Sequence, residues 1–257
     1  MSILTKLLAR PETCGLELDS PRTTELRRDI IRKTPFLCSI YREWYTLIAS
    51  ALSSSPRPVL ELGSGGGFMA EVVPRLITSE LFSCPHVHVV LDGQHLPFAD
   101  SSLDGVVMTN VLHHLPEVNA FLHEASRCVS RGGVIAMIEP WVTPWSRWVY
   151  THLHHEPFDP DAAHWRFPSS GPLSGANGAL PWMVFQRDAE RFHREHPNWV
   201  LERLEPMMPF RYLVSGGVSR RCFMPGWSTP PWRALERLFA PWMLRVAMFA
   251  FIVLRRR

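Results

Sequence analysis

Lysine is nearly absent from this sequence of 257 residues. Arginine supplies 25 of the 27 basic residues, and lysine occurs only at Lys6 and Lys33. The formal net charge is +3, and no run of five or more basic residues occurs. A nucleic-acid-binding domain normally concentrates positive charge on one face or along one segment. The composition therefore argues against a nucleic-acid partner.

Cysteine is also sparse, and its spacing excludes the common disulfide and zinc patterns. The five cysteines stand at positions 14, 38, 84, 128 and 222, so their number is odd and no CxxC pair occurs. A chain of this size can bury a full core without disulfides. We therefore expect a reduced, cytoplasmic protein.

A long hydrophobic run is missing too. The first ten residues contain neither an extended apolar stretch nor a small-residue cleavage site, so no secretory signal is expected. The apolar run Val246–Leu254 has roughly half of the ~20 residues that a membrane-spanning helix requires. This run is either a buried strand or an interfacial anchor, and the second alternative would give weak contact with a membrane surface.

The remaining composition, with 46% hydrophobic and 20% charged residues, is that of a globular protein. We expect one domain with four segments. These are N-terminal helices (1–55), a cofactor-binding core (56–140), a substrate cap inserted between strands five and six (141–198), and C-terminal strands with a helix (199–257). In the first segment, Pro35 divides two helical patterns, Thr23–Thr34 and Phe36–Leu52.

Strand-like and helix-like patterns alternate through the core segment, which predicts a parallel sheet and an α/β fold. Expected strands are Val59–Leu62, Leu76–Ser79, Val87–Leu91, Gly105–Thr109 and Val134–Ile138. Expected helices are Phe68–Val73 and Val118–Val129, the second stopped by Gly132-Gly133. Further along, Trp199–Leu204 and Met248–Leu254 are expected strands, and Trp232–Leu244 is an expected helix.

The stretch Trp141–Pro197 differs from the core because tryptophans, histidines and prolines are interleaved in it. We expect it to cover the active site. Its aromatic side chains could form a folded lid with its own core or an apolar pocket for a substrate. The sequence leaves these two alternatives open.

Four glycines follow the first expected strand. Gly63, Gly65, Gly66 and Gly67 allow a sharp turn and a close approach of the backbone to a ligand, as in loops that bind nucleotide-like cofactors. The nicotinamide-dinucleotide fingerprint requires glycine where this chain has Phe68. Dinucleotide binding is therefore disfavoured.

The segment Glu61-x-Gly63-x-Gly65-x-Gly67 resembles the first motif of class I S-adenosylmethionine-dependent methyltransferases. Glu80 lies 17 residues beyond Gly63, where that family places the acid that binds the ribose. Asp92-Gly93-Gln94-His95-Leu96-Pro97-Phe98 is similar to the family's segment at the adenine. Residues 102–116, which end in Asn110-Val111-Leu112-His113-His114-Leu115-Pro116, resemble the subgroup that contains ubiquinone and menaquinone methyltransferases.

This resemblance covers about residues 59–140 and implies a Rossmann-like fold. The expected sheet has seven mostly parallel strands with an antiparallel last strand, Met248–Leu254, and helices on both faces. The implied cofactor is S-adenosylmethionine, with Glu80 on the ribose hydroxyls, Asp92 on the adenine amino group and the Gly93 N–H on the ring. The full set of implied cofactor-binding residues is Glu61, Gly63, Ser64, Gly65, Gly67, Glu80, Asp92, Gly93 and Asn110.

The methyl acceptor is expected to be a small molecule or a lipid-linked compound, with transfer to oxygen favoured over nitrogen or carbon. A hydroxyl acceptor loses a proton, and histidine is the usual general base. The candidates are His114, His154 and His155. No metal site is expected, because His152, His154, His155 and Glu156 do not match the spacing of known zinc ligand sets.

Other hypotheses fit parts of the sequence. The fold could be retained as a non-catalytic partner protein, which the intact Gly63, Glu80 and Asp92 disfavour. A nicotinamide-dependent oxidoreductase is disfavoured by Phe68. Methylation of DNA bases is disfavoured because Asn110-Val111-Leu112-His113 departs from the N-P-P-Y motif of enzymes that flip a base. The sequence does not reveal the oligomeric state.

Overall fold

The structure is a computed structural model that describes residues 10, 12, 20–154, 156–168, 171 and 175–257. Two helices precede the sheet, α2 (Pro21–Lys33) and α3 (Pro35–Ala49), which confirms the expected pair. The Ser20 side chain caps α2 by accepting a hydrogen bond from Thr23 N at 3.3 Å. Pro35 stands in the first turn of α3, where its missing N–H is not needed.

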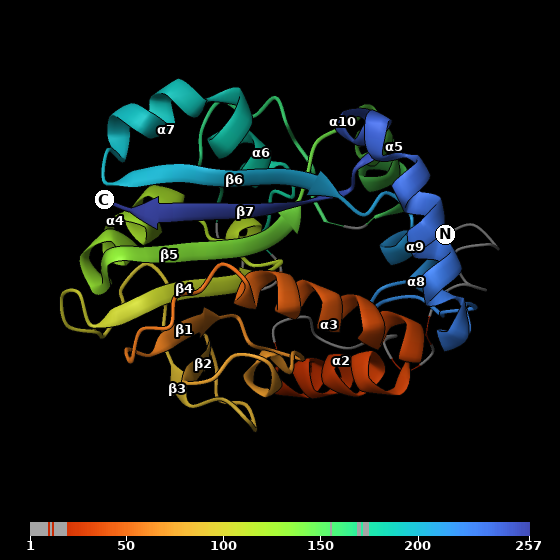
Figure 1. Cartoon of the computed structure of the whole chain (residues 1–257), viewed down its shortest axis with the longest axis horizontal. Helices are drawn as coiled ribbons and strands as arrows, with labels where there is room; N and C mark the ends of the chain where they lie inside the picture. Colours follow the sequence, from red (N-terminus) through yellow and green to blue (C-terminus); the bar gives the residue numbers. More distant parts are fainter. Residues whose placement is uncertain (1–9, 11, 13–19, 155, 169–170, 172–174) are drawn as a thin grey trace.

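A single seven-stranded sheet follows, and its strand order is β3-β2-β1-β4-β5-β7-β6 (Figure 1). The first five strands pair in parallel, whereas β7 runs antiparallel to both of its neighbours. The expected fold class is therefore confirmed, including the reversed last strand. The strands are β1 (Val59–Leu62), β2 (Leu76–Glu80), β3 (Val89–Val90), β4 (Leu103–Thr109), β5 (Val129–Pro140), β6 (Trp199–Met207) and β7 (Phe249–Arg256).

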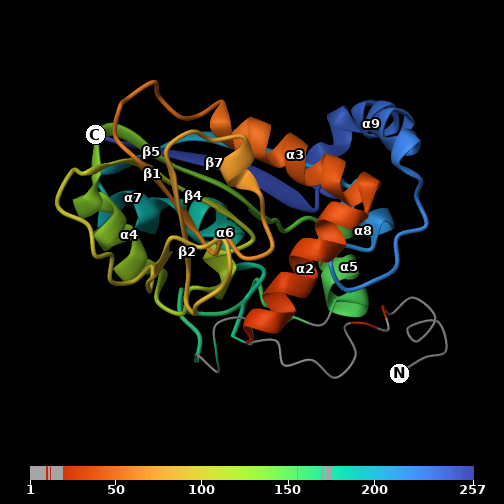
Figure 2. The same cartoon turned by 90° about the horizontal axis from the view of Figure 1, so that it is seen from below.

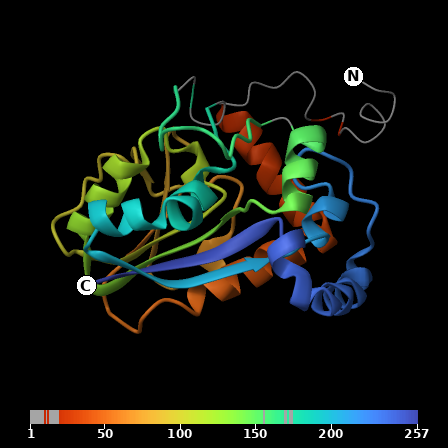
Figure 3. The same ribbon diagram turned by 90° about the horizontal axis from the view of Figure 1, so that it is seen from above.

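Both faces of the sheet are covered by helices, as Figures 2 and 3 show from below and above. Side chains alternate between the faces along each strand. In β4, Val106 and Met108 join a core cluster with Phe121 of α4 (Val118–Cys128), whereas Val107 joins a second cluster with Trp44 of α3. Strands buried on both faces explain the nearly continuous apolar runs of the sequence.

The last strand resolves the alternatives for the apolar C-terminal run. β7 lies between β5 and β6, and Phe249 to Leu254 are all buried. The run is thus a central strand and not an interfacial anchor. Arg255 belongs to the strand and forms an ion pair with Glu202 on β6. No helix of the described residues is long and apolar enough to cross a membrane.

Three expectations for the core differ in detail from the structure. The helix expected at Phe68–Val73 is only a short 3-10 turn, η2 (Met69–Glu71), and β3 has two residues instead of five. The pair Gly132-Gly133 lies inside β5 and does not stop α4. A Cβ on Gly133 would lie 2.4 Å from the Asp104 carbonyl oxygen, so glycine here serves the close approach of two strands.

The helix expected at Trp232–Leu244 is also interrupted. It consists of α9 (Thr229–Leu238), the 3-10 turn η6 (Ala240–Trp242) and α10 (Met243–Val246). Pro241 explains the break, because proline cannot donate the backbone hydrogen bond that a continuous helix requires. A short helix, α8 (Arg211–Ser215), joins β6 to this region and ends at Gly216 with a left-handed φ of 73°.

The stretch 141–198 contributes to the core of the domain. It contains α5 (Pro144–Leu153), α6 (Leu180–Trp182), the π-helical turn η4 (Met183–Arg187) and α7 (Ala189–Glu195). Phe185 and Phe192 are buried in the same cluster as strand residues such as Leu60. Trp141 and Trp165 are buried as well. This part of the stretch is therefore a layer on the sheet.

Candidate active site

The glycine loop makes a sharp turn at the carboxyl end of β1. Gly63 and Gly65 have left-handed φ angles of 61° and 42°, which glycine adopts at little cost. A Cβ on Gly63 would lie 2.6 Å from Cγ2 of Val111, which follows β4. Ser64 N donates to Ser79 O at 2.9 Å. The loop after β1 is thus held between the ends of β2 and β4.

Two acidic side chains flank this loop. Glu80 is buried at the end of β2 and accepts a hydrogen bond from Leu81 N at 3.1 Å, and its Oε1 lies 3.0 Å from the Cβ position of Gly65. Glu61 is also buried. Burial, with a smaller contribution from the Glu80 charge, raises the pKa of Glu61 to about 7, against a hydrogen bond from Ser64. Both carboxylates therefore face the turn that the sequence singled out.

The remaining cofactor candidates lie at the same edge of the sheet. Asp92 follows β3, is partly exposed and accepts a hydrogen bond from Gln94 N at 2.9 Å. A Cβ on Gly93 would lie 3.1 Å from Leu62 at the end of β1. Asn110 has a left-handed φ of 57° just after β4. The structure thus gathers residues from four loops at one edge.

Helix α2 packs directly onto the glycine loop, which the sequence did not predict. A Cβ on Gly66 would lie 2.7 Å from Arg28 N. The Arg28 guanidinium donates a hydrogen bond to the carbonyl oxygen of Gly67. A Cβ on Gly67 would lie 2.6 Å from the Tyr45 hydroxyl of α3. Three of the four glycines, at 63, 66 and 67, are therefore required by close packing in addition to any role toward a ligand.

These residues fit an adenosyl cofactor. The positive φ angles of Gly63 and Gly65 form a cradle that side chains would fill, and the buried Glu80 carboxylate offers acceptor oxygens for a pair of hydroxyls. The carboxyl ends of parallel strands are where ligands bind in open α/β sheets. The glycine turn and the Glu80 carboxylate are thus groups that the binding of S-adenosylmethionine would require.

A second buried cluster lies beside this loop, after β4 and β5. Glu139 is fully buried in β5 and accepts hydrogen bonds from Val111 N and Leu112 N, both at 2.8 Å. Its other oxygen lies 2.7 Å from Nδ1 of His113. Nε2 of His113 faces Glu156 at 3.6 Å. Burial would lower the pKa of His113, but Glu139 and then Glu156 outweigh it and raise the pKa to about 9.

His114 has the opposite electrostatic environment. Burial, reinforced by the neighbouring His113, lowers the pKa of His114 to about 4. Its Nδ1 lies 3.0 Å from the carbonyl oxygen of Gly175, so Nδ1 carries the hydrogen and Nε2 the lone pair. The centroids of the His113 and His114 rings are 4.2 Å apart. An imidazolium and a neutral imidazole thus stand side by side at the carboxyl edge of the sheet.

The other histidine candidates are less well defined. His154 follows α5, is partly exposed and accepts a hydrogen bond from Glu156 N at 3.3 Å. His155 lies outside the described residues. The structure therefore brings His114 and His154 to the same cluster through Glu156, with His114 the more deeply enclosed.

The cluster also contains possible metal ligands. Among the described residues, His113, His114 and Glu156 are the group whose ligand atoms lie within 4.8 Å of one another. With a pKa of about 9, His113 is an imidazolium at neutral pH, so a metal ion would have to displace its proton in order to bind there. The Glu139 and Glu156 carboxylates already satisfy its charge. The arrangement is complete as an ion-pair network.

Sequence reasoning missed Glu139 and Arg28. Glu139 directly follows the expected strand Val134–Ile138, and it is the only acidic residue in the run Val134–Pro140. A lone carboxylate in a buried strand needs hydrogen-bond partners, and that was the available signal. Arg28 gave no comparable signal, because its contact with Gly67 joins residues 39 positions apart.

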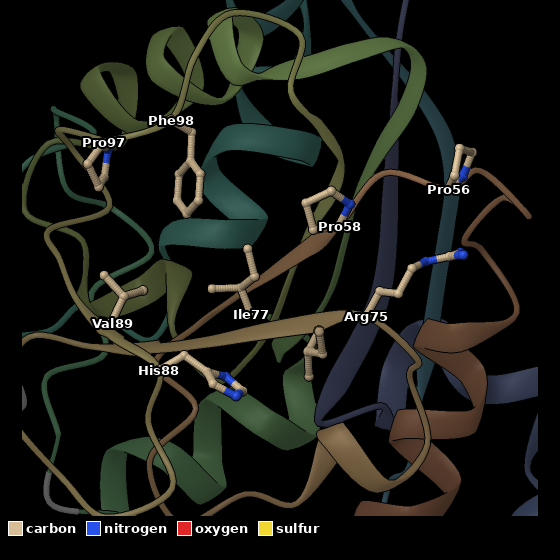
Figure 4. Close-up of a pocket in the computed structure, with 9 residues that line it drawn as sticks. Pro56, Pro58, Arg75, Ile77, His88, Val89, Pro97 and Phe98 are labelled. Carbon is tan, nitrogen blue, oxygen red and sulfur yellow. The ribbon is translucent and has the colours of Figure 1, made fainter.

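A surface pocket elsewhere on the sheet does not overlap this site (Figure 4). Its lining comes from the amino ends of β1, β2 and β3, with Pro58, Ile77 and Val89, and from Phe98. No α-helix occurs between Leu81 and His88 among the described residues, so this face of β2 is uncovered. The pocket lies at the end of the strands opposite to the glycine loop.

Comparisons with known proteins agree with this geometry. Residues 60–137 match the model of a methyltransferase domain. No curated protein sequence matches the chain. The chain is structurally similar to geranyl diphosphate C-methyltransferase from Streptomyces coelicolor A3(2), with 12% identity, a TM-score of 0.55, and coverage of 97% of this chain and 89% of that one.

Two other solved structures are similar at a lower level. The [4+2]-cyclase SpnF has 13% identity, a TM-score of 0.48, and coverage of 83% of this chain and 80% of that one. An S-adenosylmethionine-dependent methyltransferase from Mesorhizobium loti has 15% identity and a TM-score of 0.47, with coverage of 82% and 96%.

Residues 60–137 thus match a methyltransferase domain, and the seven-stranded fold of the whole chain agrees with that match. The matched residues include Glu61, the glycine loop, Glu80, Asp92, Asn110 and the histidine pair. The resemblance to methyltransferases that the sequence suggested is confirmed over residues 60–137, while the ubiquinone and menaquinone subgroup stays a prediction.

Proposed function

We propose that this protein transfers a methyl group from S-adenosylmethionine to a small-molecule or lipid-linked acceptor, with a hydroxyl oxygen as the favoured acceptor atom. The observation that carries the proposal is the convergence of the Gly63–Gly67 turn, the buried Glu80 carboxylate and the His113–His114 pair at one sheet edge. The structurally similar Streptomyces enzyme is described in complex with geranyl diphosphate and S-adenosyl-L-homocysteine, which supports a small-molecule acceptor.

Binding would depend on the residues of the four loops. Glu80 would accept hydrogen bonds from the ribose hydroxyls, Asp92 from the adenine amino group, and the Gly93 N–H would donate to the ring. Glu61, Ser64 and Asn110 would hold the turn and the polar end of the cofactor. When bound, the cofactor supplies an activated methyl group, so the main task of the protein is to align the acceptor.

His114 is our candidate for the group that receives the acceptor proton. Its Nε2 carries a lone pair, because Nδ1 donates to the Gly175 carbonyl oxygen. The lowered pKa keeps the ring neutral at pH 7, so Nε2 can accept a hydrogen bond from a hydroxyl. A ring with this pKa is a weak base, and it would take the proton only as methyl transfer makes the hydroxyl oxygen positive. His154 and His155 are the alternatives, and Glu156 connects His154 to the same cluster.

Calorimetric titration of S-adenosylhomocysteine into the purified protein tests the cofactor site. Glu80→Gln replaces charge-assisted hydrogen bonds by neutral ones, which should weaken binding by roughly 5-fold to 30-fold. Glu202→Gln is the matched control, since Glu202 lies on the edge strand β6 and pairs only with Arg255 among the described residues. Equal binding by both variants would contradict the assignment of Glu80.

Two outcomes of this titration would overturn the enzyme proposal. NAD is titrated in parallel, and binding of NAD in place of S-adenosylhomocysteine would favour a nicotinamide-dependent oxidoreductase. Binding of neither would favour the second candidate, a non-catalytic protein with this fold. One observation favours that candidate: α2 packs on the glycine loop, and the Arg28 guanidinium already donates a hydrogen bond to the Gly67 carbonyl oxygen.

A further inference from the structure

The region from Phe223 to Arg245, here called the C-terminal lobe, exposes an unusual amount of apolar surface. It includes α9, η6 and α10 and the 3-10 turn η5 (Gly226–Ser228). Nine large hydrophobic side chains are exposed among the described residues, and six of them lie in this lobe. These six are Phe223, Trp227, Leu235, Leu238, Trp242 and Leu244. Such a concentration marks an interaction site, whereas scattered apolar residues would not.

Helix α9 is amphipathic, but its apolar side faces outward. Pro231, Ala234, Leu235 and Leu238 recur at the spacing of one helical face, and all four are exposed. The opposite face contains Thr229 and Glu236, which are buried, and Trp232 and Arg233, which are half-buried. Folding of the domain therefore leaves the hydrophobic face of this helix without a partner among the residues that the structure describes.

One buried ion pair and a partly exposed one hold α9 in this orientation. Glu236 accepts hydrogen bonds from Phe210 N and Arg211 N at 3.0 and 2.9 Å, and its carboxylate pairs with the Arg211 guanidinium at 2.5 Å. Arg211 reaches Glu43 of α3 at 2.7 Å, and Arg233 of α9 reaches the same carboxylate at 2.6 Å. Rotating α9 inward would leave these charges unpaired, which is costly in a buried position.

The charge around the exposed apolar face is of one sign. Between residues 220 and 246 the sequence has five arginines and a single acidic residue, the buried Glu236. Arg221, Arg237 and Arg245 are exposed. Cations that flank leucine and tryptophan side chains are typical of helices that lie in the interface of an anionic membrane. Trp227 and Trp242 are of the residue type enriched at headgroup depth.

A row of aromatic rings connects the lobe to α5. Trp242 contacts Phe239 at 6.1 Å between ring centroids, and Phe239 contacts Phe210 at 5.0 Å. Phe210 contacts Trp145 at 6.2 Å, and Trp145 stacks on Trp148 at 5.7 Å. Trp148 is also exposed. This packed row makes the surface a rigid continuation of the domain.

We propose that the C-terminal lobe docks onto an anionic lipid surface, with α9 lying in the plane of the interface and its exposed leucines inserted among the lipids. Helix α9 has ten residues, so it lies on the membrane and does not cross it. Figure 1 shows the lobe at the end of the molecule toward which β4 and β5 run. If the proposed methyl transfer holds, docking would bring that edge of the sheet close to a lipid-linked acceptor.

Vesicle flotation with the tag-free full-length protein tests the proposal. Vesicles of phosphatidylcholine with one quarter phosphatidylglycerol should bind the protein at least tenfold more tightly than pure phosphatidylcholine vesicles. The double variant Leu238→Glu with Leu244→Glu should lose at least tenfold in binding, because both side chains are exposed and would carry like charge to the lipid. Arg245→Ala should weaken binding about fivefold and reduce its salt dependence.

Leu81→Glu is the matched control, because Leu81 is exposed after β2 and lies outside the lobe. This variant should bind vesicles like the natural protein. S-adenosylhomocysteine titration of every variant separates a failure of docking from a failure of the cofactor site. Absence of binding to anionic vesicles would overturn the proposal. Retention of vesicle binding by the double variant would also overturn the proposal. So would the finding that the natural protein binds no vesicles and self-associates in light scattering, while the double variant does not self-associate.

Discussion

Replacing Glu139 by glutamine would remove one of the two carboxylates that flank His113. The carboxylate is fully buried and lies 2.7 Å from His113 Nδ1, while its other oxygen accepts two backbone hydrogen bonds. An amide can keep the two backbone bonds through its oxygen, but its NH2 group then faces the imidazolium N–H. The variant therefore loses the ion pair with His113 and keeps the shape of the side chain at position 139.

The expected loss of stability follows from the pKa of His113. The folded pKa of about 9 exceeds the ordinary value of 6.5, so the stabilisation is fully present below pH 6.5 and is lost as the pH rises through 9. Linkage converts this difference into about 3 kcal/mol at pH 6 and less than about 0.5 kcal/mol at pH 9.5. Removal of a buried charge partner costs a similar amount in other proteins, about 3 to 5 kcal/mol.

Urea unfolding followed by circular dichroism at pH 6 and pH 9.5 measures this effect. The difference in unfolding free energy between the natural protein and Glu139→Gln should be about 3 kcal/mol at pH 6 and should shrink below about 1 kcal/mol at pH 9.5. Glu202→Gln, on an exposed ion pair, should change stability by less than about 0.5 kcal/mol at both pH values. A Glu139→Gln loss that is the same at both pH values would refute the assignment of a charged His113.

Two further predictions concern other parts of the fold. Gly63→Ala combines a left-handed φ of 61° with a Cβ placed 2.6 Å from Val111, so thermal denaturation should show a loss of about 2 to 3 kcal/mol; an unchanged melting temperature would contradict the tight turn. Burial lowers the pKa of His196 to about 4, so its contribution to stability is present above pH 6.5 and is lost as the pH falls toward 4. Urea titrations at pH 7 and pH 5 should show a loss of unfolding free energy in the natural protein and a smaller loss in His196→Gln. Equal losses in the two proteins would contradict the lowered pKa of His196.

Local patterns in the sequence were sufficient for the central architecture. The apolar runs, the glycine turn and the alternation of strands and helices predicted the sheet and a strand at Met248–Leu254, whose reversed direction was implied by the family resemblance. They succeeded because burial on both faces demands a continuous apolar run, and a turn with positive φ demands glycine. Elements with a weak local signal, such as the residues around Met69 and β3, were less well predicted.

The tertiary structure alone decided what depends on contacts between distant segments. The packing of Arg28 against Gly67, the pairing of Glu139 with His113 and the opposite pKa shifts of His113 and His114 join residues that local patterns treat separately. The orientation of α9 was decided in the same way, because an amphipathic pattern fixes which residues share a face but not which face turns inward. That choice depends on the buried charges of Arg211 and Glu236 and on the half-buried Glu43, which come together only in the folded chain.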